Sequence, residues 1–484
     1  MKTSKKDPNQ AKNAYDYIVL GSGPAGVAAA IQASKLGQSV AIVEKNPKKL
    51  GGARLHYGTI PSKTMREVVS NIDYARPHLE KTQNEQNLPK IPMKYIVDRV
   101  RKVSGDGEQL IREHLEANNI DIVIGYGSIE SPNCVKVKTE NQSTQYIETK
   151  TILIATGSKP RRPPEVIFDG QVVVDSDGIW SVPTLPKTMA IFGAGIIGSE
   201  YACYFASLGV KTTLVDSRQQ IMQHMDNEVT GELKRCMESI GIQFVLGQAM
   251  KKISNVSSRA VIELENDIIE TEICFFAAGR VSATSDMDLE KIGVRMNERG
   301  AILVNDYFQT DVPSIYAAGD SIGPPGLVST SMEQGRIAAE HAIQGVMRRL
   351  PKVFPIGMFT IPEMSSVGMS EEEVQAAGIE YVVGRARYHE VARGYIREDH
   401  GLLKIIIDQN TKKILGIHIV GTDAANLVHI GQCFMLAGLP VTALVDSIVF
   451  SYPTLAEAYR VATFNGINKI NNKDMPEKKP NPAA

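Results

Sequence analysis

One sequence device occurs twice in this chain, and its repetition limits the folds open to it. An apolar run leads into Gly21-Ser-Gly-Pro-Ala-Gly26, and another leads into Gly193-Ala-Gly-Ile-Ile-Gly198. In each copy a segment rich in small residues follows. A second apolar run then ends in an acid, Glu44 or Asp216, 23 positions after the first glycine. This order of elements predicts a strand, a glycine turn, a helix and a parallel strand, which is an α/β unit.

The glycines and the acid of each copy suit a dinucleotide, although a bare tight turn is the simpler alternative. The first glycine permits the turn, the second lets the backbone approach a pyrophosphate, and the third lets the helix pack closely on the strand. The helix N-terminus then faces the phosphates, and the acid can accept hydrogen bonds from ribose hydroxyls. Two such units in one chain imply two dinucleotides and a transfer of electrons between them. The predicted residues are Gly21, Gly23, Gly26 and Glu44, and then Gly193, Gly195, Gly198 and Asp216.

The second copy leaves the nucleotide open between NAD and NADP. Asp216 suits an unphosphorylated ribose, whereas Arg218 stands two residues later and could pair with a 2′-phosphate. A solvated surface role is the alternative for Arg218.

The remaining segments give a coarse outline of the chain. A helix is predicted over 91–118, and strands of a small sheet over 120–124, 134–138 and 145–148. Apolar strands exit into glycine at 151–157, 273–279 and 314–319. From residue 352 the pattern predicts a separate α+β domain, with strands over 404–407 and 413–420 and helices over 371–377 and 424–437.

Composition excludes several functional classes. The 484 residues include 53 Lys and Arg against 54 Asp and Glu, so no bulk charge favours nucleic acid or an anionic membrane. No signal peptide is visible, and the apolar stretch 433–445 is too short to span a bilayer. Five scattered cysteines, each taken as a small buried hydrophobe, indicate a reducing compartment. We therefore expect a cytoplasmic protein with no nucleic-acid partner, no membrane association and no metal site.

Taken together, these segments resemble the flavoprotein disulfide reductases over residues 16–470. The motifs are GSGPAG with its acid, GGxxxxxGTIPSK at 51–63, ATGS at 155–158, GAGIIGSE at 193–200 and AAGD at 317–320. The resemblance implies an α/β fold with two Rossmann-like dinucleotide-binding domains and a C-terminal α+β dimerisation domain, active as a homodimer. The implied boundaries are disordered tails at 1–14 and 471–484, an FAD-binding domain at 15–160 and 281–350, an NAD(P)-binding domain at 161–280, and a dimerisation domain at 351–470.

The resemblance also assigns roles to residues. Lys63 and Glu200 match the family's ion pair beside the reactive flavin nitrogen, with an ordinary salt bridge as the alternative. Thr59 would lie near the flavin, in a space-filling or hydrogen-bonding role rather than a chemical one. The implied FAD contacts are Gly21, Gly23, Gly26, Glu44, Lys45, Gly51, Gly52, Gly127, Thr156, Gly157 and Asp320. The implied nicotinamide nucleotide contacts are Gly193, Gly195, Gly198, Asp216, Arg218 and Gly279.

The family's disulfide chemistry is missing from this sequence. Arg54 and Thr59 occupy the positions of the redox cysteines, and neither side chain can shuttle two electrons as a dithiol does. Tyr452 stands where the family presents a histidine, while Glu457 is kept. A phenol is a poor base at neutral pH, because its ordinary pKa lies near 10. Both changes predict a flavoprotein that does not reduce disulfides.

One branch of the family, the soluble pyridine nucleotide transhydrogenases, shares this pattern. The shared features are GTIPSK, a histidine three residues before the threonine (His56), and a C-terminal YPTxAEAYRVA; the branch has cysteine where Arg54 stands here. The resemblance implies FAD-dependent hydride transfer between NADPH and NAD, by a ping-pong scheme without a redox disulfide. The alternatives are an NAD(P)H dehydrogenase with a quinone or another acceptor, and a flavin-binding sensor whose catalysis has decayed.

Overall fold

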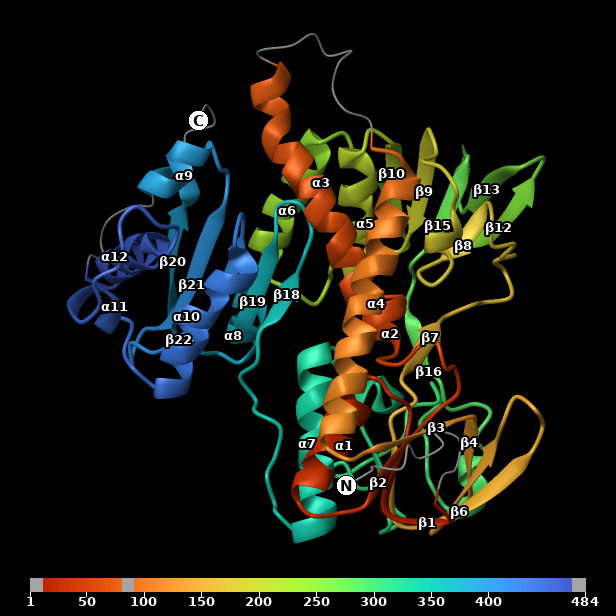
Figure 1. Ribbon diagram of the computed structural model, residues 1–484. Coiled ribbons are helices and arrows are strands. Elements are labelled where there is room, and N and C mark those ends of the chain that lie inside the picture. The colour runs from red at the N-terminus through yellow and green to blue at the C-terminus, as the bar shows by residue number, and fades with distance from the viewer. Residues whose placement is uncertain (1–11, 81–90, 472–484) are drawn as a thin grey trace, which may run out of the picture. The chain divides into compact units, whose positions relative to one another are not determined.

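The computed structural model describes residues 12–80 and 91–471 (Figure 1). The chain divides into two compact units. Unit 1 comprises Met1–Pro186, Lys252–Ile262 and Glu272–Leu350, and unit 2 comprises Lys187–Lys251, Glu263–Thr271 and Pro351–Ala484. Of the predicted tails, residues 1–11 and 472–484 lie outside the described residues, while Ala14 begins the first strand and Asn471 ends the last helix. The three predicted domain ranges stay a prediction.

Unit 1 is built on a seven-stranded sheet. Its order is β3-β2-β1-β6-β5-β4, and β17 also pairs with β6. The pairs β2-β3, β1-β2, β1-β6 and β6-β17 are parallel, whereas β5 runs antiparallel to β4 and β6. The strands are β1 (Ala14–Leu20), β2 (Val40–Glu44), β3 (Asp121–Ile124), β4 (Tyr126–Ser131), β5 (Cys134–Lys138), β6 (Thr144–Ile154) and β17 (Ile315–Ala317).

The prediction that the strands over 120–148 form a small separate sheet is wrong. The strand over 121–124 lies beyond β2 at one edge of the seven-stranded sheet, while the strand over 134–138 lies on the other side of β6. Residues 145–148 and 151–154, predicted as two strands, form the single strand β6. Alternation gives each strand's buried face but not its partner, because pairing depends on contacts between distant segments.

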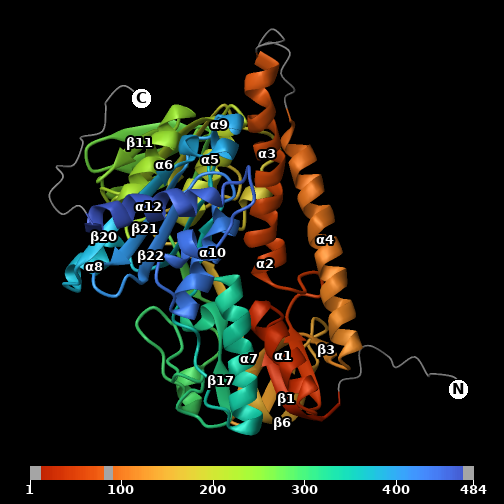
Figure 2. The ribbon, with the colours of Figure 1, turned by 90° about the vertical axis from the view of Figure 1, so that its left-hand side faces the viewer.

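Helices of unit 1 pack on one another as well as on the sheet. Helix α1 (Pro24–Lys35) and helix α7 (Val328–Gln344) run side by side in both views (Figures 1 and 2). Gly335 of α7 permits this, since a Cβ there would stand 2.2 Å from the Ala25 carbonyl oxygen. The predicted helix over 91–118 is confirmed as α4, which pairs with α3. The further helices of this unit are α2 (Ala53–His56), α3 (Thr59–Glu80) and α4 (Met93–Ala117), with short 3-10 turns at Ile179–Ser181, Leu289–Ile292 and Gly319–Ile322.

Shorter strands complete unit 1. β8 pairs in parallel with β15, and β7 pairs antiparallel with β16. β12, β13 and β14 form a three-stranded sheet in that order; the chain passes from unit 1 to unit 2 within β13, so β14 belongs to unit 2. The bounds are β7 (Ser158–Pro160), β8 (Val173–Asp175), β12 (Met250–Val256), β13 (Arg259–Leu264), β14 (Ile268–Thr271), β15 (Ile273–Phe276) and β16 (Arg280–Ser282).

Unit 2 contains the second predicted strand-helix-strand device. β10 pairs in parallel with both β9 and β11, and helix α5 connects β9 to β10, as the sequence predicts. Asp226 caps the next helix, α6, by accepting a hydrogen bond from the Val229 amide at 3.3 Å. The elements are β9 (Thr188–Phe192), α5 (Ile196–Ser207), β10 (Lys211–Asp216), α6 (Asn227–Ser239) and β11 (Gln243–Leu246).

The C-terminal part of unit 2 is α+β, as predicted. Its five-stranded antiparallel sheet has the order β18-β19-β22-β21-β20. The predicted strands and helices are confirmed as β21, β22, α8 and α10. The strands are β18 (Ile356–Met358), β19 (Met364–Gly368), β20 (Tyr381–Arg387), β21 (Leu402–Asp408) and β22 (Ile414–Val420). The helices are α8 (Glu371–Ala376), α9 (Ala392–Arg397), α10 (Ala424–Ala437), α11 (Ala443–Asp446) and α12 (Glu457–Asn471), with a 3-10 turn at Tyr388–Glu390.

Candidate active site

The parallel strands of unit 1 bring the first device to one edge of the sheet. Leu20 of β1 lies between Val43 of β2 and Ile154 of β6, and Ala317 of β17 lies beside Ile154. The segments that follow these strands therefore meet at their carboxyl ends. In α/β sheets this edge is where ligands bind, at the point where neighbouring connections leave in opposite directions. The segments that meet here hold the predicted FAD contacts at Gly21–Gly26, Glu44, Thr156, Gly157 and Asp320.

The glycine loop of unit 1 is packed too tightly for side chains. Gly21 has φ +105°, and a Cβ on it would stand 2.5 Å from the Ala155 carbonyl oxygen. A Cβ on Gly26 would stand 2.0 Å from the Gly21 carbonyl oxygen. Gly23 caps α1 without a side-chain hydrogen bond, so backbone N–H groups of the first helical turn are left for an anion. These contacts fit the pyrophosphate role predicted for the loop.

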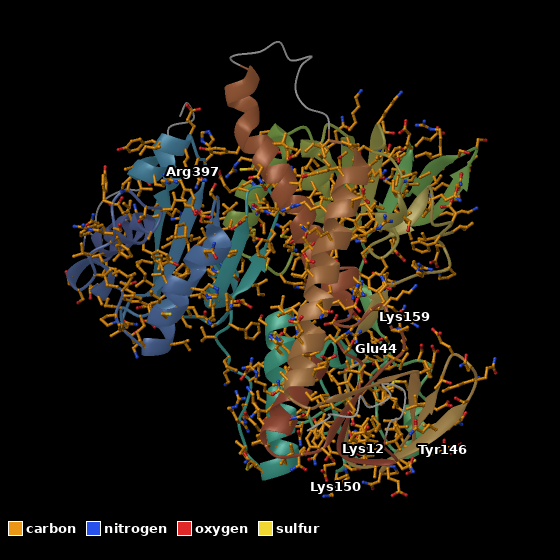
Figure 3. The ribbon with its side chains drawn as sticks, in the orientation of Figure 1. Lys12, Glu44, Tyr146, Lys150, Lys159 and Arg397 are labelled. Carbon is orange, nitrogen blue, oxygen red and sulfur yellow. The ribbon has the colours of Figure 1, made fainter. Side chains whose placement is uncertain are left out.

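Glu44 is held rigidly at the end of β2 (Figure 3). It is 7% exposed and accepts hydrogen bonds from the Ser22 amide (3.2 Å), the Ser22 hydroxyl (2.5 Å) and the Asn46 amide (3.1 Å). The Ser22 hydroxyl accepts in turn from the Gly51 amide at 3.0 Å. A carboxylate offers about four lone pairs, so Glu44 keeps capacity for a ribose hydroxyl. Ser22 thus joins the glycine loop, the acid and the Gly51 turn.

We expect Ser22→Ala to weaken FAD binding. The change leaves the Gly51 amide without its acceptor and removes one donor from Glu44, which should cost about 1–3 kcal/mol, or about 5- to 150-fold in affinity. The dissociation constant of FAD from the apoprotein measures this. Ser143→Ala is the control, because Ser143 lies at an exposed turn where its hydroxyl bonds to the neighbouring Thr139 hydroxyl. Equal FAD affinity in Ser22→Ala and the wild type would contradict the role given to Ser22.

Other predicted FAD contacts have varied surroundings. The Thr156 hydroxyl is buried and has no hydrogen-bond partner among residues 12–80 and 91–471, so a bound group with an acceptor would satisfy it. Asp320 accepts from the Ser158 hydroxyl at 2.6 Å. Gly127 lies on β4 against Leu20, where a Cβ would stand 2.9 Å from the leucine methyl. Gly52 approaches the glycine loop, and Lys45 is exposed beside Glu44. A buried hydroxyl and a glycine cradle at one sheet edge fit FAD.

Sequence reasoning missed Arg280, which ties the strand exits of unit 1 together. Its guanidinium donates to the Ser158 hydroxyl (2.9 Å), the Ser158 carbonyl (2.9 Å), the Ser176 hydroxyl (3.1 Å) and Asp177 (3.2 Å). Ser158 then donates to Asp320. The chain Arg280–Ser158–Asp320 holds Asp320, one of the predicted FAD contacts, in place. The only sequence signal was the position of Arg280 directly after a strand exit, beside Gly279.

The second device, in unit 2, repeats the glycine geometry. Gly193 has φ +112° and donates its amide to the Val215 carbonyl at 2.7 Å. A Cβ on Gly198 would stand 1.8 Å from the Gly193 carbonyl oxygen. Gly195 caps α5 without a side-chain hydrogen bond. The loop therefore presents backbone donors, as the first loop does.

Asp216 ends β10 and is paired with Arg218. The Arg218 guanidinium donates to both carboxylate oxygens of Asp216, at 2.9 and 2.7 Å. Burial alone would raise the pKa of Asp216, but hydrogen bonds from Arg218 and from the Ala194 amide lower it below its ordinary value. The pair is thus charged, and the two residues that gave opposite nucleotide predictions are bonded to each other.

Lys63 and Glu200 belong to different units, so their predicted ion pair stays a prediction. Lys63 is half-buried on α3. Glu200 is 2% exposed on α5 and accepts from the Phe359 amide at 2.8 Å. Gly279, the last predicted nucleotide contact, has φ +105° and open space around it.

The loop at the lost redox positions contains no thiol. Thr59 begins α3, and Arg54 lies on α2. The Arg54 Nε is buried without a hydrogen-bond partner in the described part of the chain, and burial lowers the pKa of Arg54. His56 contacts the Leu50 carbonyl at 2.9 Å, and burial lowers its pKa as well. His56 is thus bonded to the backbone of its own loop.

The C-terminal motif lies in unit 2. Tyr452 is 70% exposed, and a hydrogen bond with the Tyr395 side chain raises its pKa. A raised pKa leaves even less of the phenolate, the form that could accept a proton, at neutral pH. One carboxylate oxygen of Glu457 is buried without a hydrogen-bond partner within the described residues.

The five cysteines are free thiols in different environments. Cys203 and Cys274 are buried, as expected, and burial raises the pKa of Cys274 to about 12. The same expectation is wrong for Cys433, which is exposed, and only partly right for Cys134 and Cys236, which are half-buried. Within residues 12–80 and 91–471, no group of three or more His, Cys, Asp or Glu side chains is arranged to hold a metal ion.

A cavity of about 550 Å³ lies at the other end of the unit 1 sheet, lined by Tyr15, Ser39, Glu148 and Lys150 among others. Figure 3 shows Lys12 and Lys150 at that end, away from Glu44. The cavity is therefore separate from the dinucleotide edge.

Comparison with protein families identifies the class of protein. The family model described as pyridine nucleotide-disulphide oxidoreductase matches residues 15–335, and its dimerisation domain matches residues 354–463. The chain belongs to this family, because the first match covers well over half of it. It is an FAD-dependent oxidoreductase of α/β fold with the family's dimerisation domain, and the predicted fold class is confirmed.

Curated relatives are more specific in name. A protein of Mycobacterium tuberculosis strain H37Ra named soluble pyridine nucleotide transhydrogenase is 41% identical over 461 residues, covering 94% of this chain and 98% of the relative. A protein of the same name from Colwellia psychrerythraea is 36% identical over 462 residues, covering 94% and 98%. The predicted resemblance to this branch is confirmed.

Solved structures share the fold. The HOCl-induced flavoprotein disulfide reductase RclA from Escherichia coli matches with a TM-score of 0.84 at 25% identity, covering 93% of this chain and 99% of that one. LpdA from Mycobacterium tuberculosis matches with a TM-score of 0.85 at 24% identity, covering 93% and 99%. Among the described helices, none is both long and apolar enough to cross a bilayer.

Proposed function

We propose that this protein transfers hydride between NADPH and NAD through bound FAD, without a redox disulfide. The observation that carries the proposal is a pair of intact dinucleotide devices combined with Arg54 and Thr59 at the redox-cysteine positions. With no dithiol to receive electrons, return of hydride to a second nicotinamide is the simplest outcome. The names of the curated relatives support the same reaction.

In this proposal the residues of the first device bind FAD, and three further residues lie near the flavin. Gly21, Gly23 and Gly26 would hold the FAD pyrophosphate, Glu44 its ribose and Asp320 its ribityl chain. When bound, FAD supplies a two-electron carrier that accepts hydride from one nicotinamide and gives it to another. Lys63 would place a positive charge that favours the reduced form, oriented by Glu200. Thr59 would fill space or hydrogen-bond where the family has a thiol.

The second device would bind each nicotinamide nucleotide in turn, which makes the scheme ping-pong. Gly193, Gly195 and Gly198 would hold the pyrophosphate, with Gly279 toward the nicotinamide end. Backbone donors at a helix N-terminus suit an anion of either nucleotide. We further propose that the protein is a cytoplasmic homodimer, supported by the dimerisation-domain match and by the five free cysteines.

The direct test is anaerobic turnover by the purified holoprotein. With NADPH as donor and thio-NAD as acceptor, we expect thio-NADH to form, and we expect the same with NADH as donor. Formation from NADH but not from NADPH would reject NADP use and favour an NADH dehydrogenase. Flavin reduction without thio-NADH formation, together with rapid turnover on a quinone, would replace the proposal with the dehydrogenase alternative.

A further inference from the structure

The Asp216 carboxylate is saturated by donors from its own chain. It is 4% exposed, and it accepts from the Ala194 amide (2.6 Å), the Arg218 amide (2.8 Å) and two guanidinium nitrogens of Arg218. Four donors match the roughly four lone-pair positions of a carboxylate. A ribose hydroxyl can therefore bond to Asp216 only if one of these donors leaves.

Only the Arg218 side chain is free to leave. The amide donors are fixed by the backbone, whereas the Arg218 side chain is 38% exposed and the Asp216 side chain 5% exposed. Water can solvate the partly exposed guanidinium once it leaves, and the two backbone amides keep donating to the buried carboxylate, so the ion pair can open when a new donor takes the place of Arg218. The exposed partner can turn into solvent while the buried carboxylate stays in place.

The same guanidinium is ready to receive a phosphate without leaving Asp216. A guanidinium has five N–H donors, and Asp216 uses only two of them. The remaining donors suit the oxygens of a phosphate monoester, which arginine binds in a fork geometry. Arg218 would then stand between Asp216 and the phosphate and cancel the repulsion between the two anions.

We propose that the Asp216–Arg218 pair is a latch that lets one site accept both nucleotides. The latch is closed while the Arg218 guanidinium is bonded to Asp216, and a 2′-phosphate binds to Arg218 in this closed state. An unphosphorylated ribose opens the latch and takes the guanidinium's place on Asp216. This inference rests on the proposed function, because it assumes that NADPH and NADH share the second device. It makes Arg218 a ligand for one nucleotide and a competitor of the other.

Binding of the adenosine halves alone tests the latch. The probes are 2′,5′-ADP and 5′-AMP, titrated calorimetrically into the FAD-loaded protein, and no hydride transfer is needed. Arg218→Met should weaken 2′,5′-ADP by about 10- to 150-fold, the value of a charge-assisted bond. The same variant should bind 5′-AMP at least as tightly as the wild type. Asp216→Asn should do the opposite, weakening 5′-AMP and preserving or strengthening 2′,5′-ADP.

Two further variants keep the test decisive. Arg218→Lys retains the charge but not the fork, so it should recover only part of the 2′,5′-ADP affinity. Arg235→Met removes a guanidinium that pairs with Glu232 on α6, and it should change neither ligand. Unchanged 2′,5′-ADP affinity in Arg218→Met, or equal weakening of both probes, would overturn the latch. Opposite shifts without transhydrogenase turnover would support the latch and reject the proposed function alone.

Discussion

Replacing Lys404 with methionine is expected to destabilise unit 2 by about 3–5 kcal/mol. Lys404 is 1% exposed on β21, and its ammonium lies 2.9 and 3.0 Å from the Asp226 oxygens, 3.1 Å from Glu228 and 2.5 Å from Glu371. Asp226 is itself fully buried. Removing the ammonium takes the ion-pair partner from the buried Asp226 carboxylate, whereas Glu228 is partly exposed and keeps its ion pair with Arg385. A buried charge that has lost its partner is far more costly than a lost exposed ion pair.

Urea denaturation of the holoprotein measures the change. Lys413→Met is the matched control, because Lys413 is exposed in the same unit and its loss should change the free energy of unfolding by no more than about 0.5 kcal/mol. A loss below about 1 kcal/mol in Lys404→Met would mean that water reaches Asp226 once the lysine is gone. The buried-charge argument would then fail for this site.

The local elements of the dinucleotide devices could be predicted from sequence because their signals are local. Glycine spacing, small-residue segments and terminal acids predict the order strand, helix, strand in both copies, and the structure has β1-α1-β2 and β9-α5-β10. Of the C-terminal strands, β21 and β22 were predicted from strand-like runs, whereas β18, β19 and β20 were not predicted. Lys404 stands out in the sequence, because it is the one charged residue in the apolar run Leu402–Ile407. The sequence does not show which carboxylates pair with it. Asp226 and Glu371 lie 178 and 33 positions away in the chain.

Contacts between distant segments account for what the sequence could not give. The edge position of β3 depends on its pairing with β2, from which helices α2, α3 and α4 separate it in the chain, and the alternation of polar and apolar residues in β3 does not show this pairing. Ser22 has no distinguishing feature in the sequence, where it stands between two glycines. In the structure its hydroxyl donates a hydrogen bond to Glu44 and accepts one from the Gly51 amide. Asp216 and Arg218 were weighed as rival signals. Their side chains are hydrogen-bonded to each other, and this contact depends on side-chain rotamers that the sequence does not show.

The largest effect on ligand binding is expected from valine at the third glycine of either device. A Cβ on Gly198 would stand 1.8 Å from the Gly193 carbonyl oxygen, and one on Gly26 would stand 2.0 Å from that of Gly21. Both neighbours are backbone atoms, so no side-chain rotation relieves the clash, and the loop must move away from its phosphate-binding shape. We expect Gly26→Val to lose FAD and Gly198→Val to lose nicotinamide nucleotide, each by at least about 100-fold, or about 3 kcal/mol.

The two variants should fail in different ways, and this separates the devices. Gly198→Val should purify with its flavin and fail to reduce it with NADPH or NADH, whereas Gly26→Val should purify without flavin. Flavin content and anaerobic bleaching measure both effects. The controls are Gly105→Ala on α4 and Gly231→Ala on α6, where a Cβ meets nothing within 4 Å and helix stability should rise by about 0.5–1 kcal/mol. Loss of flavin from Gly198→Val as well would contradict the assignment of one ligand to each device, because damage at the second loop would then extend to the first.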